Sequence, residues 1–217
     1  MHIKQVIFLF CLIVGITDFS TAQNNLLSLD ALEKVKIYTS IEDALDEPEN
    51  VFALKIRNQA LEKVPPEIAQ LKNLQYLDLG LNPIENLPDS LFLLQNLQIL
   101  DMWGAKLKTL PNKIAQLKHL KFLYLDYNQL TQLPPEIGQL KKLEILDLEG
   151  NQLARLPTEI GLLSALEILD LEKNQLITIP EQLDSLQKLT VLDLEGNQLT
   201  SLATSIGQLE NLTYLYL

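Results

Sequence analysis

Apolar residues recur along this chain in a 23-residue frame that runs from Val51 to the C-terminus. In the copy Leu143–Ala165, numbered 1 to 23, positions 1, 4, 6, 11, 14, 18 and 21 hold leucine or isoleucine. Seven full copies begin at Val51, Leu74, Leu97, Leu120, Leu143, Leu166 and Leu189, and these seven positions always hold Leu, Ile, Val or Met. An eighth copy begins at Leu212 and stops after six residues. So regular a repeat predicts a solenoid.

The spacing inside one copy predicts its local structure. Positions 4 and 6 place two side chains on the same face of a short strand, whereas positions 14, 18 and 21 have helical spacing. Position 15 is proline in six copies, and position 16 often carries a residue that favours a helix N-cap: Asp89, Asn112, Thr158 and Thr204. One copy is therefore a strand, a turn and a short helix, and its apolar side is buried only when copies stack.

Position 9 is asparagine in five copies: Asn82, Asn128, Asn151, Asn174 and Asn197. An amide side chain both donates and accepts hydrogen bonds, so these residues predict a structural ladder where the chain leaves each strand. The third copy has Ala105 at this position, which predicts either a bound water or a local adjustment of the loop.

The pattern LxxLxLxxNxLxxLPxxIxxLxx resembles the leucine-rich repeat family in its 23-residue variety. The resemblance implies an α/β solenoid, a right-handed horseshoe with parallel strands on the concave face and short helices on the convex face. It also implies binding of a protein partner through the concave face. Among family members, the chain resembles secreted and surface proteins of bacteria.

Residues 1–22 have the features of a secretory signal peptide. His2 and Lys4 precede an apolar run, Val6–Ile16, which is shorter than the ~20 residues that span a bilayer. Small residues then predict cleavage between Ala22 and Gln23, with an uncleaved anchor as the alternative. We expect a secreted, periplasmic or cell-surface protein whose mature chain is not stably inserted in a membrane.

The remaining segments flank the repeats, which span residues 51–211. Residues 23–50 lie outside the frame and have loosely helical apolar spacing, and Ser40 with Asp43 resembles a helix start. They predict an N-terminal helical cap, with a separate binding segment as the alternative. Residues 212–217 supply an incomplete eighth strand. Its unpaired edge predicts a homodimer through Leu212–Leu217, with fraying of a monomer as the alternative.

Positions 3, 5, 7 and 8 face away from the core, so we expect partner contacts there on an exposed concave face. Two sets of side chains are candidates. The first is an aromatic patch from three consecutive copies: Tyr76, Trp103, Phe122, Tyr124 and Tyr127. The second is a double carboxylate ladder: Asp147, Glu149, Asp170, Glu172, Asp193 and Glu195. Adjacent like charges destabilise a sheet, which favours a basic partner or bound cations. The alternatives are strand propensity for the apolar positions, and solvation or backbone pairing for the acids.

Composition argues against catalysis and nucleic-acid binding. Cleavage would remove Cys11, the one cysteine, and leave His119 on the convex side as the one histidine. Neither a nucleophile–histidine pair nor a Cys/His metal site can then form on the concave face, so we expect no enzyme, no cofactor and no metal. The net charge of −11 would repel nucleic acid. A self-assembling structural module and a shortened paralogue of little activity remain alternatives to a binding module.

Overall fold

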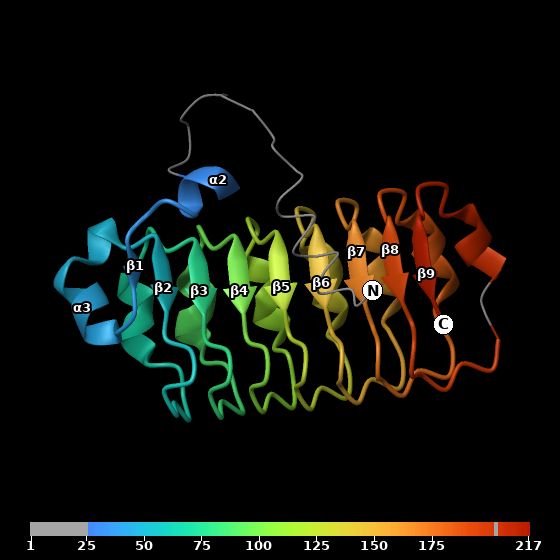
Figure 1. The fold of residues 1–217 in the computed structure, drawn as a ribbon, viewed down its shortest axis with the longest axis horizontal. Coiled ribbons are helices and arrows are strands. Elements are labelled where there is room, and N and C mark those ends of the chain that lie inside the picture. Colours follow the sequence, from blue (N-terminus) through green and yellow to red (C-terminus); the bar gives the residue numbers. More distant parts are fainter. Residues whose placement is uncertain (1–25, 202–203) are drawn as a thin grey trace.

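The computed structural model describes residues 26–201 and 204–217, so the predicted signal peptide (1–22) lies outside the described residues. Within them, nine parallel strands form one sheet in chain order (Figure 1). The strands are β1 (Ile37–Tyr38), β2 (Ala53–Lys55), β3 (Tyr76–Asp78), β4 (Ile99–Asp101), β5 (Phe122–Tyr124), β6 (Ile145–Asp147), β7 (Ile168–Asp170), β8 (Val191–Asp193) and β9 (Tyr214–Tyr216). From β2 to β9, each strand covers frame positions 3 to 5.

The strands pair in register from one repeat to the next. Ile145 lies opposite Ile168, for example, and Asp147 lies opposite Asp170. Equal frame positions therefore form columns that run along the sheet, and a side chain's column is set by its place in the frame. The predicted solenoid with parallel strands is confirmed.

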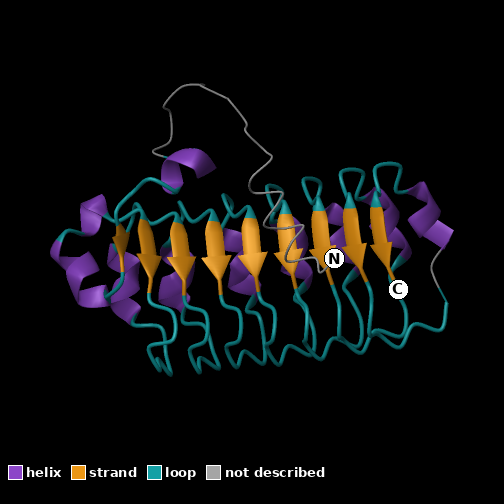
Figure 2. Cartoon of the chain, viewed as in Figure 1, coloured by secondary structure: helices purple, strands orange, loops and turns teal. Residues whose placement is uncertain are grey.

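Each repeat returns through a short 3₁₀ helix at frame positions 16 to 20. In Figure 2 the strands form one layer and these helices lie behind them. They are η2 (Pro66–Gln70), η3 (Asp89–Leu93), η4 (Asn112–Gln116), η5 (Pro135–Gln139), η6 (Thr158–Leu162), η7 (Glu181–Ser185) and η8 (Thr204–Gln208). The N-cap expected at position 16 is wrong for η3, η4 and η6, because the proline at position 15 is the N-cap and no side chain caps the helix.

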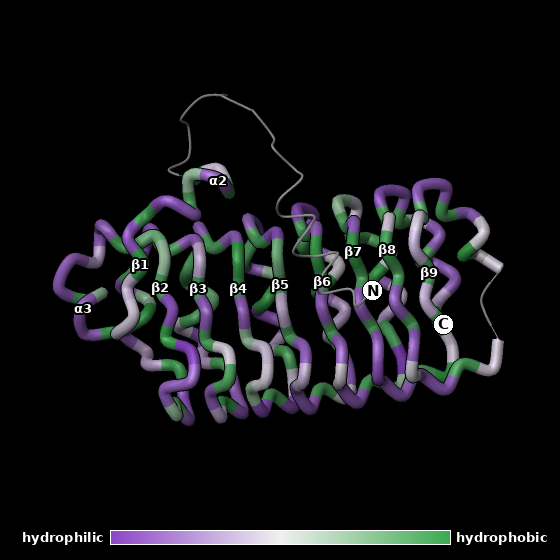
Figure 3. The backbone as a smooth tube through the Cα atoms, in the orientation of Figure 1, coloured by the Kyte–Doolittle hydropathy of each residue, from purple (hydrophilic) through white to green (hydrophobic). Residues whose placement is uncertain are grey.

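The hydrophobic core fills the space between strands and 3₁₀ helices. Figure 3 shows apolar and polar stretches alternating along each turn of the solenoid. Position 18 is fully buried from Ile68 to Leu183. Neighbouring helices approach so closely that a Cβ on Gly161 would lie 2.1 Å from the carbonyl oxygen of Gln182. This close approach explains why frame position 19 is glycine in this repeat.

The five asparagines at position 9 are hydrogen-bonded to the backbones of two repeats. Asn151 is typical: its Nδ2 donates to the carbonyls of Leu125 and Leu148, both at 3.0 Å, and its Oδ1 accepts from the N–H of Leu130 at 3.0 Å. Asn82, Asn128, Asn174 and Asn197 make corresponding bonds. Each amide therefore joins one repeat to the preceding one.

Ala105 cannot supply these bonds, and the preceding loop adjusts instead. The N–H of Ile84, which an asparagine at position 105 would accept, donates to the carbonyl of Asn82 at 2.7 Å. The loop retains its link to the next repeat, because Lys106 N–H donates to the Ile84 carbonyl at 3.1 Å. Of the two expectations from sequence, this is the local adjustment.

The described residues before the repeats divide into two parts. The strand β1, α3 (Ile41–Asp46) and η1 (Pro48–Asn50) lie at the end of the solenoid, where Tyr38 and Ala44 join the core. Ser40 caps α3 by accepting the Asp43 N–H at 3.1 Å. By contrast, α2 (Leu29–Leu32) lies beside the first repeat strands, away from this end (Figure 1). No helix in the described ranges is long and apolar enough to cross a membrane.

Position 8 has a left-handed backbone in every repeat. Its residues are Asn58, Leu81, Gly104, Tyr127, Gly150, Lys173 and Gly196, with φ between 53° and 69°. Only glycine adopts this conformation without steric cost, and other residues lose roughly 1–2 kcal/mol. From the second repeat on, a large side chain alternates with glycine, and it covers the glycine of the next repeat. For example, a Cβ added to Gly150 would lie 2.8 Å from Cδ1 of the Tyr127 ring.

Candidate partner-binding face

A second apolar cluster lies on the sheet face opposite the core. It consists of Phe122, Ile145, Ile168 and Val191, all at frame position 3, and is separate from the cluster that fills the solenoid. Successive strand residues point to opposite faces, which explains the separation. The expectation that these side chains are exposed is wrong, since at most 9% of each is accessible.

Two of the predicted aromatic residues contact each other in this region. The rings of Phe122 and Tyr124 lie 6.5 Å apart and are tilted by 56°. Tyr76 and Trp103 instead face cations: Lys55 Nζ lies 4.7 Å from the Tyr76 ring centre, and the Arg57 guanidinium lies 5.3 Å from that of Trp103. The N-terminal part of the face therefore pairs aromatic rings with positive charge.

Tyr127 lies at the edge of the face, in the left-handed loop after β5. The residue is 42% exposed, and its hydroxyl donates to the Glu149 carboxylate. It therefore links the predicted aromatic patch to the acidic side chains rather than extending the apolar cluster.

Arg57 neutralises acids that the sequence did not single out as site residues. Its Nε lies 3.6 Å from Asp78 Oδ1, and its Nη2 lies 3.5 Å from Asp101 Oδ2. Burial raises the pKa of Asp101 to about 6, with Asp78 adding to the shift and Arg57 opposing it. The reversal of charge at positions 5 and 7 of the first repeat was the sequence signal for this pairing.

The aspartates at position 5 are bonded to their own strand ends. The Oδ1 of Asp147, Asp170 and Asp193 accepts the N–H two residues later, at 3.1, 3.0 and 2.9 Å. Asp78 and Asp101 do the same. This side-chain turn orders the backbone as it leaves the sheet. Backbone pairing, the alternative to a purely functional role, is therefore present for this half of the carboxylate ladder.

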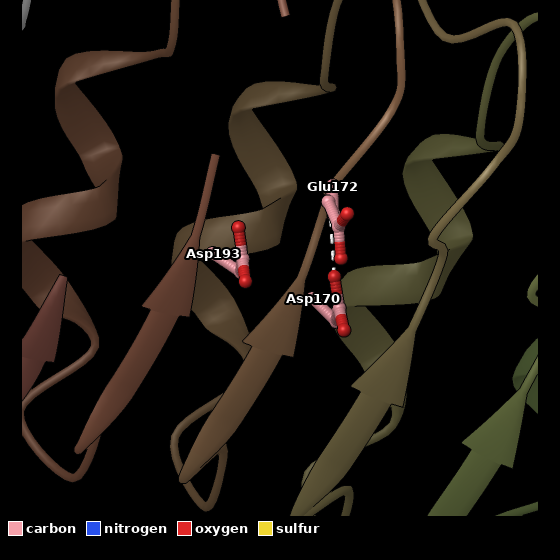
Figure 4. Close-up of side chains that lie close together, drawn as sticks. All are labelled: Asp170, Glu172 and Asp193. Atoms are coloured by element: carbon pink, nitrogen blue, oxygen red, sulfur yellow. Dashed lines mark hydrogen bonds between the residues drawn. The ribbon is translucent and has the colours of Figure 1, made fainter. Parts of the chain in front are cut away.

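Three of the predicted acids converge near the end of β7. Carboxylate oxygens of Asp170, Glu172 and Asp193 lie within 4.8 Å of one another (Figure 4). Asp170 Oδ2 is buried without a hydrogen-bond partner, and burial, with Asp193 and Glu149 nearby, raises the pKa of Asp170 to about 8. Oxygen ligands at this spacing are compatible with a hard cation.

Lys173 already supplies positive charge beside this cluster. Its Nζ lies 2.8 Å from Glu149 Oε1 and 2.7 Å from Glu172 Oε1. The expectation of exposed carboxylates is wrong for Asp147, Glu149, Asp170, Glu172 and Asp193, which are buried, whereas Glu195 is exposed. Turn bonds at position 5 and pairing with Lys173 and Tyr127 hold the buried acids against the sheet.

The chain belongs to the leucine-rich repeat family. A leucine-rich repeat region matches residues 111–178, and a second leucine-rich repeat family matches residues 72–130 and 164–217. Members of this class are typically non-catalytic scaffolds that bind proteins. No curated protein matches the chain at a significant level.

Solved structures extend the comparison. A leucine-rich repeat protein of Leptospira interrogans is 36% identical, with a TM-score of 0.71, and the match covers 84% of this chain and 58% of that one. The plant peptide hormone receptor RGFR1 in complex with RGF2 is 29% identical, with a TM-score of 0.67 over 77% of this chain and 28% of the receptor. An internalin of Listeria monocytogenes shares the fold at 24% identity, with a TM-score of 0.61 over 76% of this chain and 46% of that one. This chain thus spans less than two thirds of each protein.

Proposed function

We propose that this protein is an exported binding module that engages a protein partner through its concave face. The observation that carries the proposal is the separate apolar cluster of Phe122, Ile145, Ile168 and Val191 on the strand face opposite the core. A solenoid needs only one apolar side to stack its repeats. Its second apolar row has no part in that stacking, so this face carries apolar side chains that the stacked fold does not require.

The aromatic residues beside this cluster give the partner its strongest contacts. Trp103 and Tyr124 combine a large apolar area with a polar group, which makes such residues the usual energetic centres of interfaces. The partner has a basic surface, because the exposed Glu195 and the net charge of −11 attract positive charge. The RGFR1 structure supports this use of the fold, since that receptor is in complex with RGF2.

A capture experiment with the mature chain tests the proposal. A partner is isolated on wild-type protein, and its affinity is then measured for a variant that combines Trp103→Ala and Tyr124→Ala. Leu162→Ala is the matched control, because Leu162 is 52% exposed but lies in η6 on the convex side. We expect the double variant to bind about 30-fold more weakly and the control to bind normally. Equal binding by the wild type and a folded double variant would refute the concave-face proposal.

Export forms part of the same proposal and has its own test. Residues 1–22 supply the charged start, the short apolar run and the small residues of a signal peptide. Mass spectrometry of protein collected outside the cytoplasm should show a chain that begins at Gln23. A membrane-retained chain that still begins at Met1 would contradict export by cleavage.

Self-association through β9 is a second candidate function. Leu215 and Leu217 are 37% and 63% exposed, and β9 is the last strand of the described sheet. An open strand edge can pair with the same edge of a second copy about a two-fold axis. A surface hollow lined by Leu194, Leu199 and Leu217 lies beside it.

A further inference from the structure

The segment before α2 lies beside the second and third repeats, where β3 and β4 begin. Leu27 N–H donates to Gln75 Oε1 at 2.8 Å, and the Leu27 carbonyl accepts from Gln98 Nε2 at 2.8 Å. Two residues later, Leu29 packs against the second apolar cluster. Since 48 and 71 residues separate Leu27 from the two glutamines, this contact is tertiary rather than local.

Gln75 and Gln98, the glutamine pair, are arranged to hold a peptide backbone. They occupy frame position 2 of consecutive repeats, and no other copy has glutamine there. Gln98 Nε2 also donates to Gln75 Oε1 at 2.9 Å, and both side chains are buried, at 3% and 0% exposure. One side chain thus presents an acceptor and its neighbour a donor, which together satisfy both backbone groups of a single residue, as a strand would.

The contacts define the chemistry of what binds here. Bonds to a backbone N–H and C=O do not depend on the side chain of the bound residue. The contact made by the residue two positions later does, because Leu29 packs against apolar side chains of the second cluster. The segment turns into α2 at Leu29, with the N-cap Ser28 Oγ accepting the Ala31 N–H at 3.2 Å. The site therefore selects a short extended segment followed by an aliphatic residue.

We propose that the glutamine pair is a peptide-binding site for segments of the form x-x-Leu, and that the chain's own Leu27–Leu29 occupies it and competes with a partner. This inference rests on the proposed function, because it names the kind of segment that the concave face takes. The segment follows the predicted cleavage site at Ala22, so the mature chain keeps it. A tethered segment acts at an effective concentration in the millimolar range, and it lowers the apparent affinity of any external segment accordingly.

The test uses the mature chain and a synthetic peptide of residues 26–34, LLSLDALEK, with blocked ends and a fluorescent label. A release variant combines Leu27→Pro, which removes the N–H that Gln75 accepts, with Leu29→Asp, which removes the apolar contact. Fluorescence polarisation should show that the release variant binds the peptide at least tenfold more tightly than wild type does. Adding Gln98→Ala to the release variant should weaken binding at least fivefold. Gln152→Ala, at an exposed frame position 10, should leave it unchanged.

Folding is controlled for each variant by circular dichroism and melting temperature. A folded release variant that fails to bind the peptide, or that binds it regardless of Gln98→Ala, would overturn the inference. If the release variant does not fold, hydrogen exchange decides instead: the Leu27 amide should be protected in the wild-type chain and should exchange at least tenfold faster in Gln75→Ala. Equal protection would overturn the inference too. Partner binding that still depends on Trp103 and Tyr124 would leave the proposed function intact in either case.

Discussion

Replacing Asn151 by alanine should destabilise the middle of the solenoid by an amount that follows from its hydrogen bonds. The substitution removes three bonds to carbonyls, those of Leu125, Leu148 and Glu149, and one from the N–H of Leu130. All three carbonyls keep another donor. Leu125 O still accepts from Asn128 at 2.9 Å, and Leu148 O from Asn174 at 2.9 Å. Glu149 O still accepts from the N–H of Tyr127 at 2.7 Å. Only the Leu130 N–H loses its sole side-chain partner.

The expected loss of stability is therefore smaller than it would be if every backbone partner of Asn151 were left without a hydrogen bond. A buried unsatisfied N–H costs about 1–3 kcal/mol, and the lost bonds to carbonyls that keep another donor add about 1 kcal/mol or slightly more, so we expect a total of about 2–4 kcal/mol. The loop at Ala105 shows how part of this is recovered, because Ile84 N–H turns to the Asn82 carbonyl. The lower end of the range applies if Leu130 N–H turns in the same way.

Urea unfolding followed by circular dichroism measures the loss, provided that the m-value is unchanged. Asn197→Ala is the matched control: it removes the corresponding bonds near the C-terminal end, where Asn197 is partly exposed and water can replace them. Its loss should be about 1 kcal/mol. An Asn151→Ala loss below 1 kcal/mol, or one equal to that of Asn197→Ala, would refute the reasoning.

Three further predictions follow from packing, titration and the sheet end. Gly161→Ala should lower stability by about 1–3 kcal/mol in thermal unfolding, whereas Gly207→Ala, with nothing within 4 Å of the added Cβ, should be neutral; equal effects would contradict the packing argument. The raised pKa of Asp170, about 8, means that the folded state keeps a proton that the unfolded state loses, so stability should fall as pH rises from 5 to 8. Asp170→Asn should flatten that slope in melting temperatures measured across this range, and an unchanged slope would exclude Asp170 as its source. Light scattering should show that Leu215→Lys with Leu217→Lys converts a dimer to a monomer; a monomeric wild type would end the self-association proposal.

The leucine spacing was enough to place every repeat strand, because each frame position has one environment in a stacked array. It also placed the position-3 side chains on the face opposite the core. Their burial could not be predicted from spacing alone, since it depends on how neighbouring side chains such as Tyr124 and Leu29 pack against them. The spacing did not predict where α2 lies for the same reason. The preceding residue Leu27 is hydrogen-bonded to glutamines that are 48 and 71 residues away in the chain.

The acidic residues show a different limit of the sequence. Their spacing predicted two columns of like charge, but whether each carboxylate faces water is a matter of local geometry. At position 5 the aspartate side chains accept a hydrogen bond from the backbone N–H two residues later. At position 7, Glu149 and Glu172 depend on Lys173, which lies in a left-handed conformation that lysine rarely adopts. Nothing in the frame itself indicates that pairing.

The alternation of large residues and glycine at position 8 recurs every two repeats, whereas the leucine pattern recurs in every repeat. Leu81, Tyr127 and Lys173 each cover the glycine of the following repeat, Gly104, Gly150 and Gly196. Deleting or duplicating one 23-residue copy in this stretch would set two large side chains side by side, or place two glycines in succession, the second with no side chain over it. Deleting or duplicating two adjacent copies preserves the pattern. The natural unit for lengthening or shortening this protein is therefore the pair, although the leucines alone would allow changes of one repeat at a time.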